Sequence, residues 1–477
     1  MIDGLKPYPA YKPTSLPWLR ETPTTWEVCR NGRLFAQRNE TGFPDLPILE
    51  VSLKTGVRVR DFESSKRKQV MSDKEKYKRA RSGDIAYNMM RMWQGAVGVS
   101  PVDGLISPAY VVARPFPETN SRYFELLFRT GVYMHEVNQA SRGIVSDRNR
   151  LYWEDFKQLP SPCPPPEEQA AIVQLIDHAD RRIRRYIRLK RKLIALLNEQ
   201  KQAIINQAVT RGLDPHVKLK PSGVEWLGDV PEHFSVLPLK RLIRRGSSIS
   251  YGIVQPGLHL PGGVPFLQTT NISKRLLSAD ALQCTSASIA AAYPRSRLKG
   301  GDVVLGIRAS IGAAHVVPNE LTDANLSRGI ARIVPGPMIQ ADYLVMFLRS
   351  RATSAFWDIA KQGTTFNEVS IDTVRQLPVV VPPLSEQQSI VRGILELCSP
   401  LDTAIASAES EISLIQEYRT RLIADVVTGK LDVREAAANL PDEAEEPEAV
   451  EEPEDLAELD EEMEGEELEE AVAEAGA

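Results

Sequence analysis

Two stretches of the chain carry apolar residues at the three- and four-residue spacing of a long amphipathic helix. Eight of eleven positions along one such line in 166–211 are apolar, as are nine of eleven along the matching line in 384–428. A lone helix cannot bury such a stripe, so we expect the two to pair as an antiparallel coiled coil, with a globule at each end. The residues expected in its seam are Ile172, Ile176, Ile183, Leu193, Leu197, Ile204, Ile390, Ile394, Leu401, Ile415 and Leu422.

Both helical stretches have clear boundary signals. A Pro-Pro pair followed by Glu-Gln opens each of them, and Gly212 or Gly429 follows each end. Pro400 lies inside the second stretch, where it removes a backbone donor, and is expected to kink or interrupt that helix near residue 398.

The rest of the chain has a different pattern. Short apolar runs at 84–89, 110–115, 302–307 and 314–318 are separated by Gly- and Pro-rich segments and predict strands joined by turns. Helices are expected only in such places as 120–136 and 340–360. The fold class expected is therefore α+β, with two mixed α/β globules of low helix content separated by the two long helices.

The chain is an internal repeat. Trp18, Leu19, Pro23 and Val28 recur 208 residues later, and later motifs, including Gly83-Asp84 and Leu159-Pro160, recur at a shift of 218. An ordered series at nearly constant offset predicts a pseudo-two-fold architecture. The expected parts are a first globule at 1–160, a first spacer helix at 161–215, a second globule at 216–378, a second spacer helix at 379–435 and a disordered acidic tail at 436–477.

Charge is unevenly distributed along the chain. Residues 436–477 hold 19 acidic residues and no Lys or Arg, whereas residues 1–435 hold 58 basic and 44 acidic residues, an excess of 14. A basic body favours a polyanionic partner, although a solvated surface rich in Lys and Arg explains it equally well. The tail could compete with such a partner for the basic surface, or it could only increase the solubility of the protein.

Catalytic motifs are absent from the sequence. It has no P-loop and no Gly-x-Gly-x-x-Gly, and its six histidines and four cysteines show no metal-ligand spacing. Widely spaced cysteines fit a reducing cytoplasm, and we expect neither a signal peptide nor a membrane span. The chain is therefore expected to be non-catalytic, with no metal site and no cofactor of its own.

The motifs together resemble the specificity subunits of type I restriction–modification systems. The resemblance covers about residues 10–435. It rests on Ser-Gly-Val-Glu-Trp-Leu-Gly-Asp-Val-Pro-Glu-His-Phe at 222–234, Gly-Asp-Val-Val-Leu-Gly-Ile-Arg-Ala-Ser-Ile-Gly at 301–312, the Pro-Pro-x-x-Glu-Gln openings and Thr-Gly-Lys-Leu-Asp at 428–432. The first copy departs from the pattern at Arg20, where glycine is usual, and at Met90-Arg91-Met92-Trp93.

This resemblance implies that each globule is a target-recognition domain that reads one half of a split sequence in double-stranded DNA. The paired helices would set the gap between the halves and dock methyltransferase (modification) subunits. Those partners would bring S-adenosylmethionine and methylate adenine, and a restriction/translocase subunit would use ATP and Mg²⁺. Because the two globules differ in sequence, the target is expected to be asymmetric.

Candidate DNA contacts lie in loops that carry hydrogen-bond donors suited to base edges. They are Asn88, Arg91, Trp93, Gln94, Ser141, Arg142, Tyr251, Gln255, Arg308, Ser310, Gln362 and Thr364. Each is equally consistent with a structural turn or a phosphate contact. A basic strip at Lys66, Arg67, Lys68, Lys76, Arg79 and Arg81 is a candidate for phosphate binding, with plain solvation as the alternative.

Three other hypotheses remain open at the level of sequence. A coiled-coil assembly scaffold would explain the helices but not the duplicated globules. A specificity subunit of a methylation-only system would have the same sequence features as one from a restriction system. A stand-alone DNA-modifying enzyme is disfavoured by the missing cofactor motifs.

Overall fold

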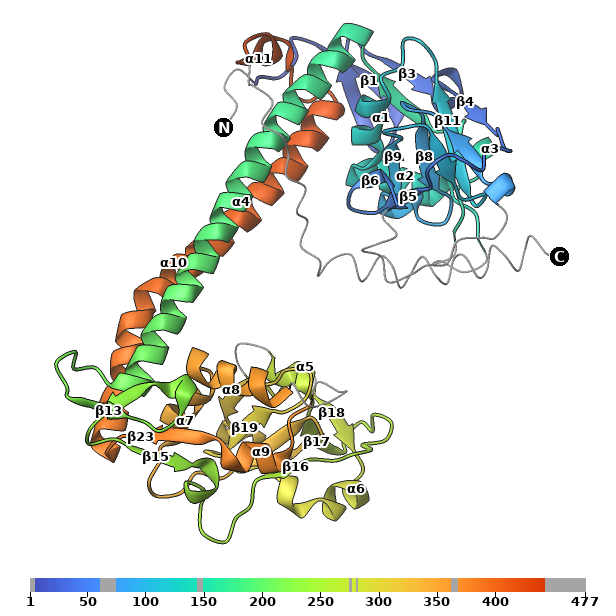
Figure 1. Ribbon diagram of the computed structural model, residues 1–477. Helices are drawn as coiled ribbons and strands as arrows, with labels where there is room; N and C mark the ends of the chain where they lie inside the picture. Colours follow the sequence, from blue (N-terminus) through green and yellow to red (C-terminus); the bar gives the residue numbers. More distant parts are fainter. Residues whose placement is uncertain are drawn as a thin grey trace. The chain divides into compact units, whose positions relative to one another are not determined.

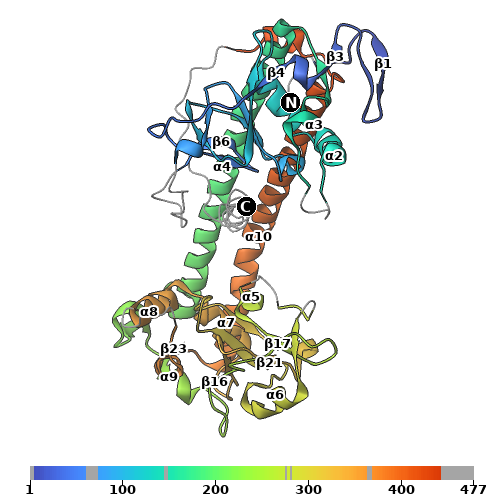
Figure 2. The ribbon, with the colours of Figure 1, turned by 90° about the vertical axis from the view of Figure 1, so that its right-hand side faces the viewer.

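The chain folds into two compact units (Figures 1 and 2). The computed structural model describes residues 5–60, 74–143, 149–273, 277–279, 282–361 and 368–441. The first unit comprises residues 1–188 and 411–477, and the second comprises residues 189–410. Two long helices, α4 (Pro166–Arg211) and α10 (Leu384–Val427), each contribute one part to either unit.

The first unit combines short strands with a few short helices. Its strands are β1 (Tyr11–Leu16), β2 (Leu19–Pro23), β3 (Glu27–Arg30), β4 (Phe35–Arg38), β5 (Leu49–Ser52), β6 (Gly56–Val59), β7 (Lys78–Ala80), β8 (Ile85–Asn88), β9 (Val97–Val99), β10 (Gly104–Ile106), β11 (Tyr110–Pro115) and β12 (Pro160–Cys163). Its shorter helices are α1 (Ser121–Phe128), α2 (Gly131–Ala140), α3 (Trp153–Phe156) and α11 (Arg434–Ala438).

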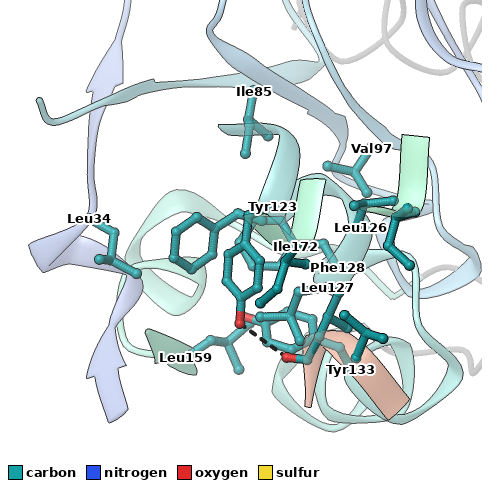
Figure 3. Packing of buried hydrophobic residues seen from close by; sticks show 14 of the residues in the cluster. Leu34, Ile85, Val97, Tyr123, Leu126, Leu127, Phe128, Tyr133, Leu159 and Ile172 are labelled. Carbon is teal, nitrogen blue, oxygen red and sulfur yellow. Dashed lines mark hydrogen bonds between the residues drawn. The ribbon is translucent and has the colours of Figure 1, made fainter. Parts of the chain in front are cut away.

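A four-stranded antiparallel sheet in the order β4-β11-β8-β9 organises the first globule. Side chains alternate along β8, so Ile85 and Tyr87 join the core that contains α1, whereas Ala86 joins the smaller core on the other face. Figure 3 shows the larger core, with Tyr123, Phe128 and Ile172 packed among aliphatic side chains. Because Ile172 belongs to α4, this core joins the globule to the long helix.

The second unit contains the corresponding elements. Its strands are β13 (Leu219–Pro221), β14 (Asp229–Pro231), β15 (Ser235–Pro238), β16 (Ser250–Tyr251), β17 (Val264–Leu267), β18 (Gln283–Thr285), β19 (Val303–Gly306), β20 (Ala314–Val316), β21 (Asn325–Leu326), β22 (Ile330–Ile333) and β23 (Pro378–Val381). Its shorter helices are α5 (Thr269–Ile272), α6 (Ala287–Ala292), α7 (Ala341–Leu348), α8 (Arg351–Lys361) and α9 (Ile371–Gln376).

The sheet of the second globule repeats that of the first. Its order is β16-β22-β19-β20, and Val303 and Leu305 face one core while Val304 faces the other. In both copies a positive-φ glycine precedes the central strand, at Gly83 (φ 88°) and Gly301 (φ 84°). The aspartate that follows accepts a backbone hydrogen bond from the residue three before it, at 2.8 Å in each copy. The predicted duplication is confirmed, and the Gly-Asp motif is its strand-entry turn.

Each globule holds the start of its own long helix through one glutamine. Gln169 donates from Nε2 to the Pro164 carbonyl (2.9 Å) and accepts from the Asn120 amide (2.9 Å). Gln387 makes the same pair of bonds to the Pro382 carbonyl and the Gln340 amide, also at 2.9 Å each. The Pro-Pro-x-x-Glu-Gln motif therefore both begins the helix and attaches it to the globule by hydrogen bonds.

Each globule also holds the end of the other long helix. The Tyr123 hydroxyl lies 3.0 Å from the carbonyl of Val427 in α10 and 3.2 Å from that of Pro162. In the second unit the Tyr343 hydroxyl lies 3.0 Å from the carbonyls of Val209 in α4 and Val380. Burial raises the pKa of both tyrosines well above its usual value, so each hydroxyl stays protonated as a donor.

The two long helices run antiparallel within each unit. In the first unit Asp180 pairs with Arg419 (2.6 Å) and Tyr186 with Glu411; in the second unit Lys201 pairs with Asp402 (2.5 Å). The numbers rise along one helix as they fall along the other, as an antiparallel coiled coil requires. The predicted pairing is confirmed.

The buried seam differs from the predicted stripe in the middle of the helices. The outer positions Ile172, Ile176, Ile183, Ile390, Ile394 and Leu422 are buried, and Leu197, Ile204, Leu401 and Ile415 are partly buried. Leu193, in contrast, is 42% exposed, so its placement in the seam is wrong. Cys398 and Ile405, which are not in the predicted set, are buried in α10, because the helix turns every 3.6 residues rather than every 3.5.

Pro400 was expected to kink or interrupt the second helix, and the predicted interruption is wrong. Helix α10 is continuous from Leu384 to Val427 with Pro400 inside it. Pro400 is on the exposed side, whereas Ile394 and Cys398 before it and Ile405 and Ala408 after it are buried. Packing on both sides of the proline offsets the loss of one backbone hydrogen bond.

The regions expected as single helices at 120–136 and 340–360 are each two helices. Helix α1 is separated from α2 by Arg129 and Thr130, and α7 from α8 by Arg349 and Ser350. Thr130 caps α2 through its side chain, which accepts from the Tyr133 amide. Among the helices of the described ranges, none is long and apolar enough to cross a membrane.

The folded body extends beyond the predicted start of the tail at 436. Ala436 and Ala437 of α11 are buried in the first core, and Glu435 pairs with Lys6 (2.5 Å). The boundary at 436 is therefore too early. Residues 442–477, which make up most of the predicted disordered tail, lie outside the described residues.

Candidate nucleic-acid interface

The predicted loop of the first globule is a compact turn after β8. Asn88 is 3% exposed and its Oδ1 accepts from the Met90 amide (2.8 Å), while Arg91 is 7% exposed. Trp93 is partly buried and its Nε1 donates to the Met90 carbonyl (2.9 Å). Gln94 is partly buried, and its Oε1 is a buried oxygen without a hydrogen-bond partner. Asn88 and Trp93 thus stabilise the turn through bonds to the backbone of Met90, rather than extending freely toward a ligand.

A second predicted loop lies against this turn. Ser141 ends α2, and its hydroxyl donates to the Val137 carbonyl (2.7 Å). Arg142 pairs with Arg150 in a short antiparallel bridge, and the Leu151 amide then donates to the Met89 carbonyl (2.9 Å). The Arg142 side chain is 75% exposed and contacts Asp155. The structure thus brings the two predicted segments of the first globule together.

The second globule joins its two corresponding segments in the same way. The Val369 amide donates to the Ile307 carbonyl (2.8 Å), and Arg308 forms an antiparallel bridge with Glu368. Val369 and Ile307 lie 218 residues after Leu151 and Met89, so this is the same bond in the second copy. Arg308 is exposed, and Ser310 is partly buried with its hydroxyl 3.4 Å from the Thr269 carbonyl. Gln362 and Thr364 lie outside the described residues.

A third segment of the second globule adjoins the same loop. Gly252 lies so close to Leu326 that a Cβ would be 1.8 Å from its carbonyl oxygen, and Ile253 donates to that oxygen (2.6 Å). The contact leaves Tyr251 50% exposed and Gln255 exposed. The Arg328 amide donates to the Ile253 carbonyl (2.8 Å), which continues this contact toward the start of β22.

Arg328 connects this segment with the Arg308 loop. Its side chain is 49% exposed, and its Nη2 lies 3.6 Å from the Glu368 carboxylate. Arg308 adjoins the same glutamate through the backbone bridge, and the Ile307 amide donates to the Gly329 carbonyl (2.9 Å). Arg328 is not among the residues predicted from the sequence. The only signal for it was its place just before the apolar strand at 330–333. We call Tyr251, Gln255, Arg308, Ser310 and Arg328 the donor surface.

Both loops end at a glycine that packs against a helix. Gly95 (φ 92°) and Gly312 (φ 87°) adopt the left-handed region. A Cβ at Gly95 would lie 3.0 Å from the Met134 sulfur in α2, and one at Gly312 would lie 3.0 Å from Trp357 in α8. The loops are therefore held at fixed positions on their scaffolds, as a recognition element requires.

Two arginines of the predicted basic strip of the first globule are paired with carboxylates. Arg79 pairs with Asp103 (2.5 Å) and its guanidinium lies 4.7 Å from the centroid of the Phe43 ring. Arg81 pairs with Glu40 (3.2 Å), and Lys76 is exposed. Lys66, Arg67 and Lys68 lie outside the described residues. Within the described ranges, no group of His, Cys, Asp and Glu side chains could hold a metal ion.

Comparison with known proteins shows which proteins this chain is similar to. Residues 258–412 match the model of the type I restriction modification DNA specificity domain. The type I restriction enzyme EcoBI specificity subunit of Escherichia coli is 22% identical over 285 residues, which cover 58% of this chain and 60% of that subunit. The chain is similar to type I specificity subunits over these parts of its length.

Other members of the specificity-subunit family extend the match. The putative type I restriction enzyme MjaX specificity subunit of Methanocaldococcus jannaschii is 23% identical over 341 residues, covering 70% of each chain. The alignment with the EcoBI subunit, by contrast, spans only 60% of that subunit's length. The relatives that this chain resembles are thus specificity subunits of type I restriction enzymes.

A solved structure shares the fold of this chain. It is described as the structural basis underlying complex assembly and conformational transition of the type I R-M system. The two chains superimpose with a TM-score of 0.61 at 17% sequence identity, over 85% of this chain and 98% of the other. Two mixed α/β globules with paired long helices are therefore an established architecture.

Proposed function

We propose that the chain is the DNA-reading specificity subunit of a type I restriction–modification system. One observation carries the proposal: the same backbone hydrogen bond joins two loops in each globule, at Leu151–Met89 and Val369–Ile307, yet the loops present different side chains. Two pairs of loops that are joined in the same way but carry different hydrogen-bond donors suit a protein that recognises two different half-sites. A scaffold without DNA reading gives no reason for such a pair.

The donor surface suits the edges of base pairs. Arginine can donate two hydrogen bonds to guanine in the major groove, and glutamine can bond adenine in both directions. Arg308 and Arg328 supply the first kind of donor and Gln255 the second, next to the exposed ring of Tyr251. The first globule presents the exposed Arg142 instead, so its half-site differs and the whole target is asymmetric.

The long helices offer a surface for partner subunits. On the part of α4 in the second unit, Leu189, Leu193 and Leu196 are 58%, 42% and 53% exposed, and their spacing places them on one helix face. Exposed leucines in a row favour protein docking. We assign this face to modification subunits, which would bring S-adenosylmethionine to methylate adenine. A restriction subunit would add ATP- and Mg²⁺-dependent translocation and cleavage, and the complex would work in the cytoplasm.

Methylation mapping tests the function. Adenine methylation would be mapped by long-read sequencing in host DNA with the gene intact, deleted, and restored on a plasmid. A split, asymmetric motif that disappears on deletion and returns on restoration is the expected result. If no motif changes although a methyltransferase subunit is expressed, the specificity role is refuted.

Two further measurements separate the alternatives. If the chain is only a scaffold, its partner subunits should bind DNA no more tightly in its presence. If it is a specificity subunit, the complex should bind DNA more tightly, and this affinity should fall steeply as the salt concentration rises. Restriction of unmethylated phage DNA by the host distinguishes a restriction system from a methylation-only system. In the latter, the motif is methylated but phage growth is unaffected.

A further inference from the structure

The part of α4 in the first unit carries a dense row of arginines. Residues 181–188 read Arg-Arg-Ile-Arg-Arg-Tyr-Ile-Arg, with five arginines and no acidic residue. All five arginines are exposed, whereas Ile183 between them is 5% exposed and faces the pair of helices. We call these five residues the arginine face: Arg181, Arg182, Arg184, Arg185 and Arg188.

The neighbouring helix neutralises this face only in part. In the first unit, α10 offers Glu411 and Glu417 along the facing stretch. The nearby Asp180 is occupied by Arg419, which donates to it from Nε (2.8 Å) and Nη2 (2.6 Å). Over residues 177–188 of α4 and 411–421 of α10, seven arginines stand against the four carboxylates Asp177, Asp180, Glu411 and Glu417. This net positive charge favours an anionic partner.

An acidic segment starts from a fixed point in the same unit. Helix α11 is buried through Ala436 and Ala437, and Arg434 lies 5.5 Å from the centroid of the Tyr8 ring. Tyr8 in turn donates its hydroxyl to Glu168 in the first turn of α4. The chain therefore leaves the folded body beside the beginning of α4. The 36 residues from 442 to 477 then carry 19 acidic residues and no Lys or Arg.

The acidic segment is long enough to reach the arginine face. Glu168 and Arg182 are 14 residues apart on α4, and at 1.5 Å per residue this is about 21 Å along the helix. An extended chain covers roughly 3.3 Å per residue, so about ten residues span that distance with slack. More than twenty residues remain to lie along the arginines.

We propose that residues 442–477 bind the arginine face and act as an internal competitor of nucleic-acid phosphates there. Paired charges on a tethered segment gain from a high effective concentration, and longer polyanions displace them by mass action. The competitor role rests on the proposed DNA-reading function, whereas the contact itself does not. Its effect would be to weaken non-specific DNA binding and thereby sharpen the preference for the target.

The contact is tested first without DNA. A fluorescein-labelled peptide of residues 441–477 would be titrated with the chain ending at Leu440, and binding followed by anisotropy. We expect the affinity to fall about tenfold between 50 and 200 mM salt, and to fall at least about fivefold in the triple variant Arg182→Gln, Arg185→Gln, Arg188→Gln. Glutamine keeps the helix propensity, so circular dichroism should show an unchanged fold.

A matched charge control decides whether the arginine face is specific. The triple variant Arg241→Gln, Arg244→Gln, Arg245→Gln removes the same charge from exposed positions of the second unit. The peptide should bind this control within about twofold of the unaltered chain, because its acidic residues pair with the arginine face. Equal loss in both triple variants, or no peptide binding at all, overturns the proposal.

The competitor role is tested with random-sequence DNA. The chain ending at Leu440 should bind such DNA about five- to tenfold more tightly than the full chain at low salt. In the arginine-face variant the truncation should have no such effect. Equal DNA affinities of the full and truncated chains overturn the competition. A failure of the proposed function would instead appear as unchanged methylation motifs, whatever the peptide does.

Discussion

The two globules share the buried hydrogen bonds that attach them to the long helices, but their loops carry different side chains. Tyr123 and Tyr343 each contact one carbonyl at the end of a long helix and one carbonyl of a strand. Gln169 and Gln387 hold the start of a long helix through the same two bonds. On the loops, by contrast, Arg91 is 7% exposed in the first globule, whereas Arg308 is exposed in the second.

Buried and exposed positions differ in the free energy of unfolding that a substitution costs. Removing a buried hydrogen-bond partner leaves an unsatisfied group and costs about 1–3 kcal/mol, so buried supports tolerate little change. A substitution in an exposed loop typically costs less than about 0.5 kcal/mol, so such a loop can acquire new donors without loss of the fold. A duplicated chain can therefore evolve two specificities on one scaffold.

The largest expected effect comes from the shared cores. Ile172 and Ile390 are fully buried and lie 218 residues apart. Replacing either with alanine should cost about 2–5 kcal/mol, through lost burial and a cavity. Hydrogen exchange resolved by mass spectrometry should show faster exchange in α1 for Ile172→Ala and in α7 for Ile390→Ala. Leu193→Ala, at an exposed position, is the control and should alter neither.

The helix-end tyrosines should respond equally in the two units. Tyr123→Phe and Tyr343→Phe each remove a hydroxyl that serves two buried carbonyls, so each should cost about 1–3 kcal/mol of stability. Chemical denaturation measures this loss. A large loss in one unit and none in the other would show that the supports are not equivalent.

The loop arginines should separate stability from binding. Arg308→Ala should weaken target binding by about 1–3 kcal/mol, because an exposed donor to a base edge is lost, and leave stability unchanged. Arg91→Ala should lower stability, since Arg91 is buried in its turn. Target binding by fluorescence anisotropy and thermal unfolding would be measured for both variants. The reverse pattern would contradict the assignment of the donor surface.

The smallest effect is expected at the ion pair of the second unit. Lys201 and Asp402 are 21% and 34% exposed, so Lys201→Ala should cost only about 0.2–1 kcal/mol. Asp180 is 6% exposed and receives two bonds from Arg419. Asp180→Ala should therefore be the more damaging of the two in thermal unfolding.

Much of the scaffold could be predicted from the sequence because its signals are periodic. The three- and four-residue spacing of apolar positions marked both long helices, and short apolar runs marked β8, β11, β19 and β20. The Gly-Asp turns and the Pro-Pro-x-x-Glu-Gln openings each occur twice, so each copy supports the same structural interpretation of the other. Pro400 misled the prediction because a local rule was outweighed by packing of Ile394 and Ile405 on either side.

The candidate site was harder to predict because it depends on tertiary neighbours. Nothing in the sequence distinguishes the buried Arg91 from the exposed Arg308, since both follow a strand of the same type. Arg328 joins the donor surface only because β16 and β22 pair and Gly252 packs on Leu326. Leu193 was assigned to the seam by spacing alone, yet it is exposed.

The central claim is that each globule reads its own half of the target. The most direct test is the methylation motif in a host that carries Arg308→Ala, mapped by long-read sequencing beside the unaltered gene. The account predicts that one half of the split motif becomes degenerate while the other half and the gap stay the same. Degeneracy in both halves, or a motif that is unchanged, would contradict it.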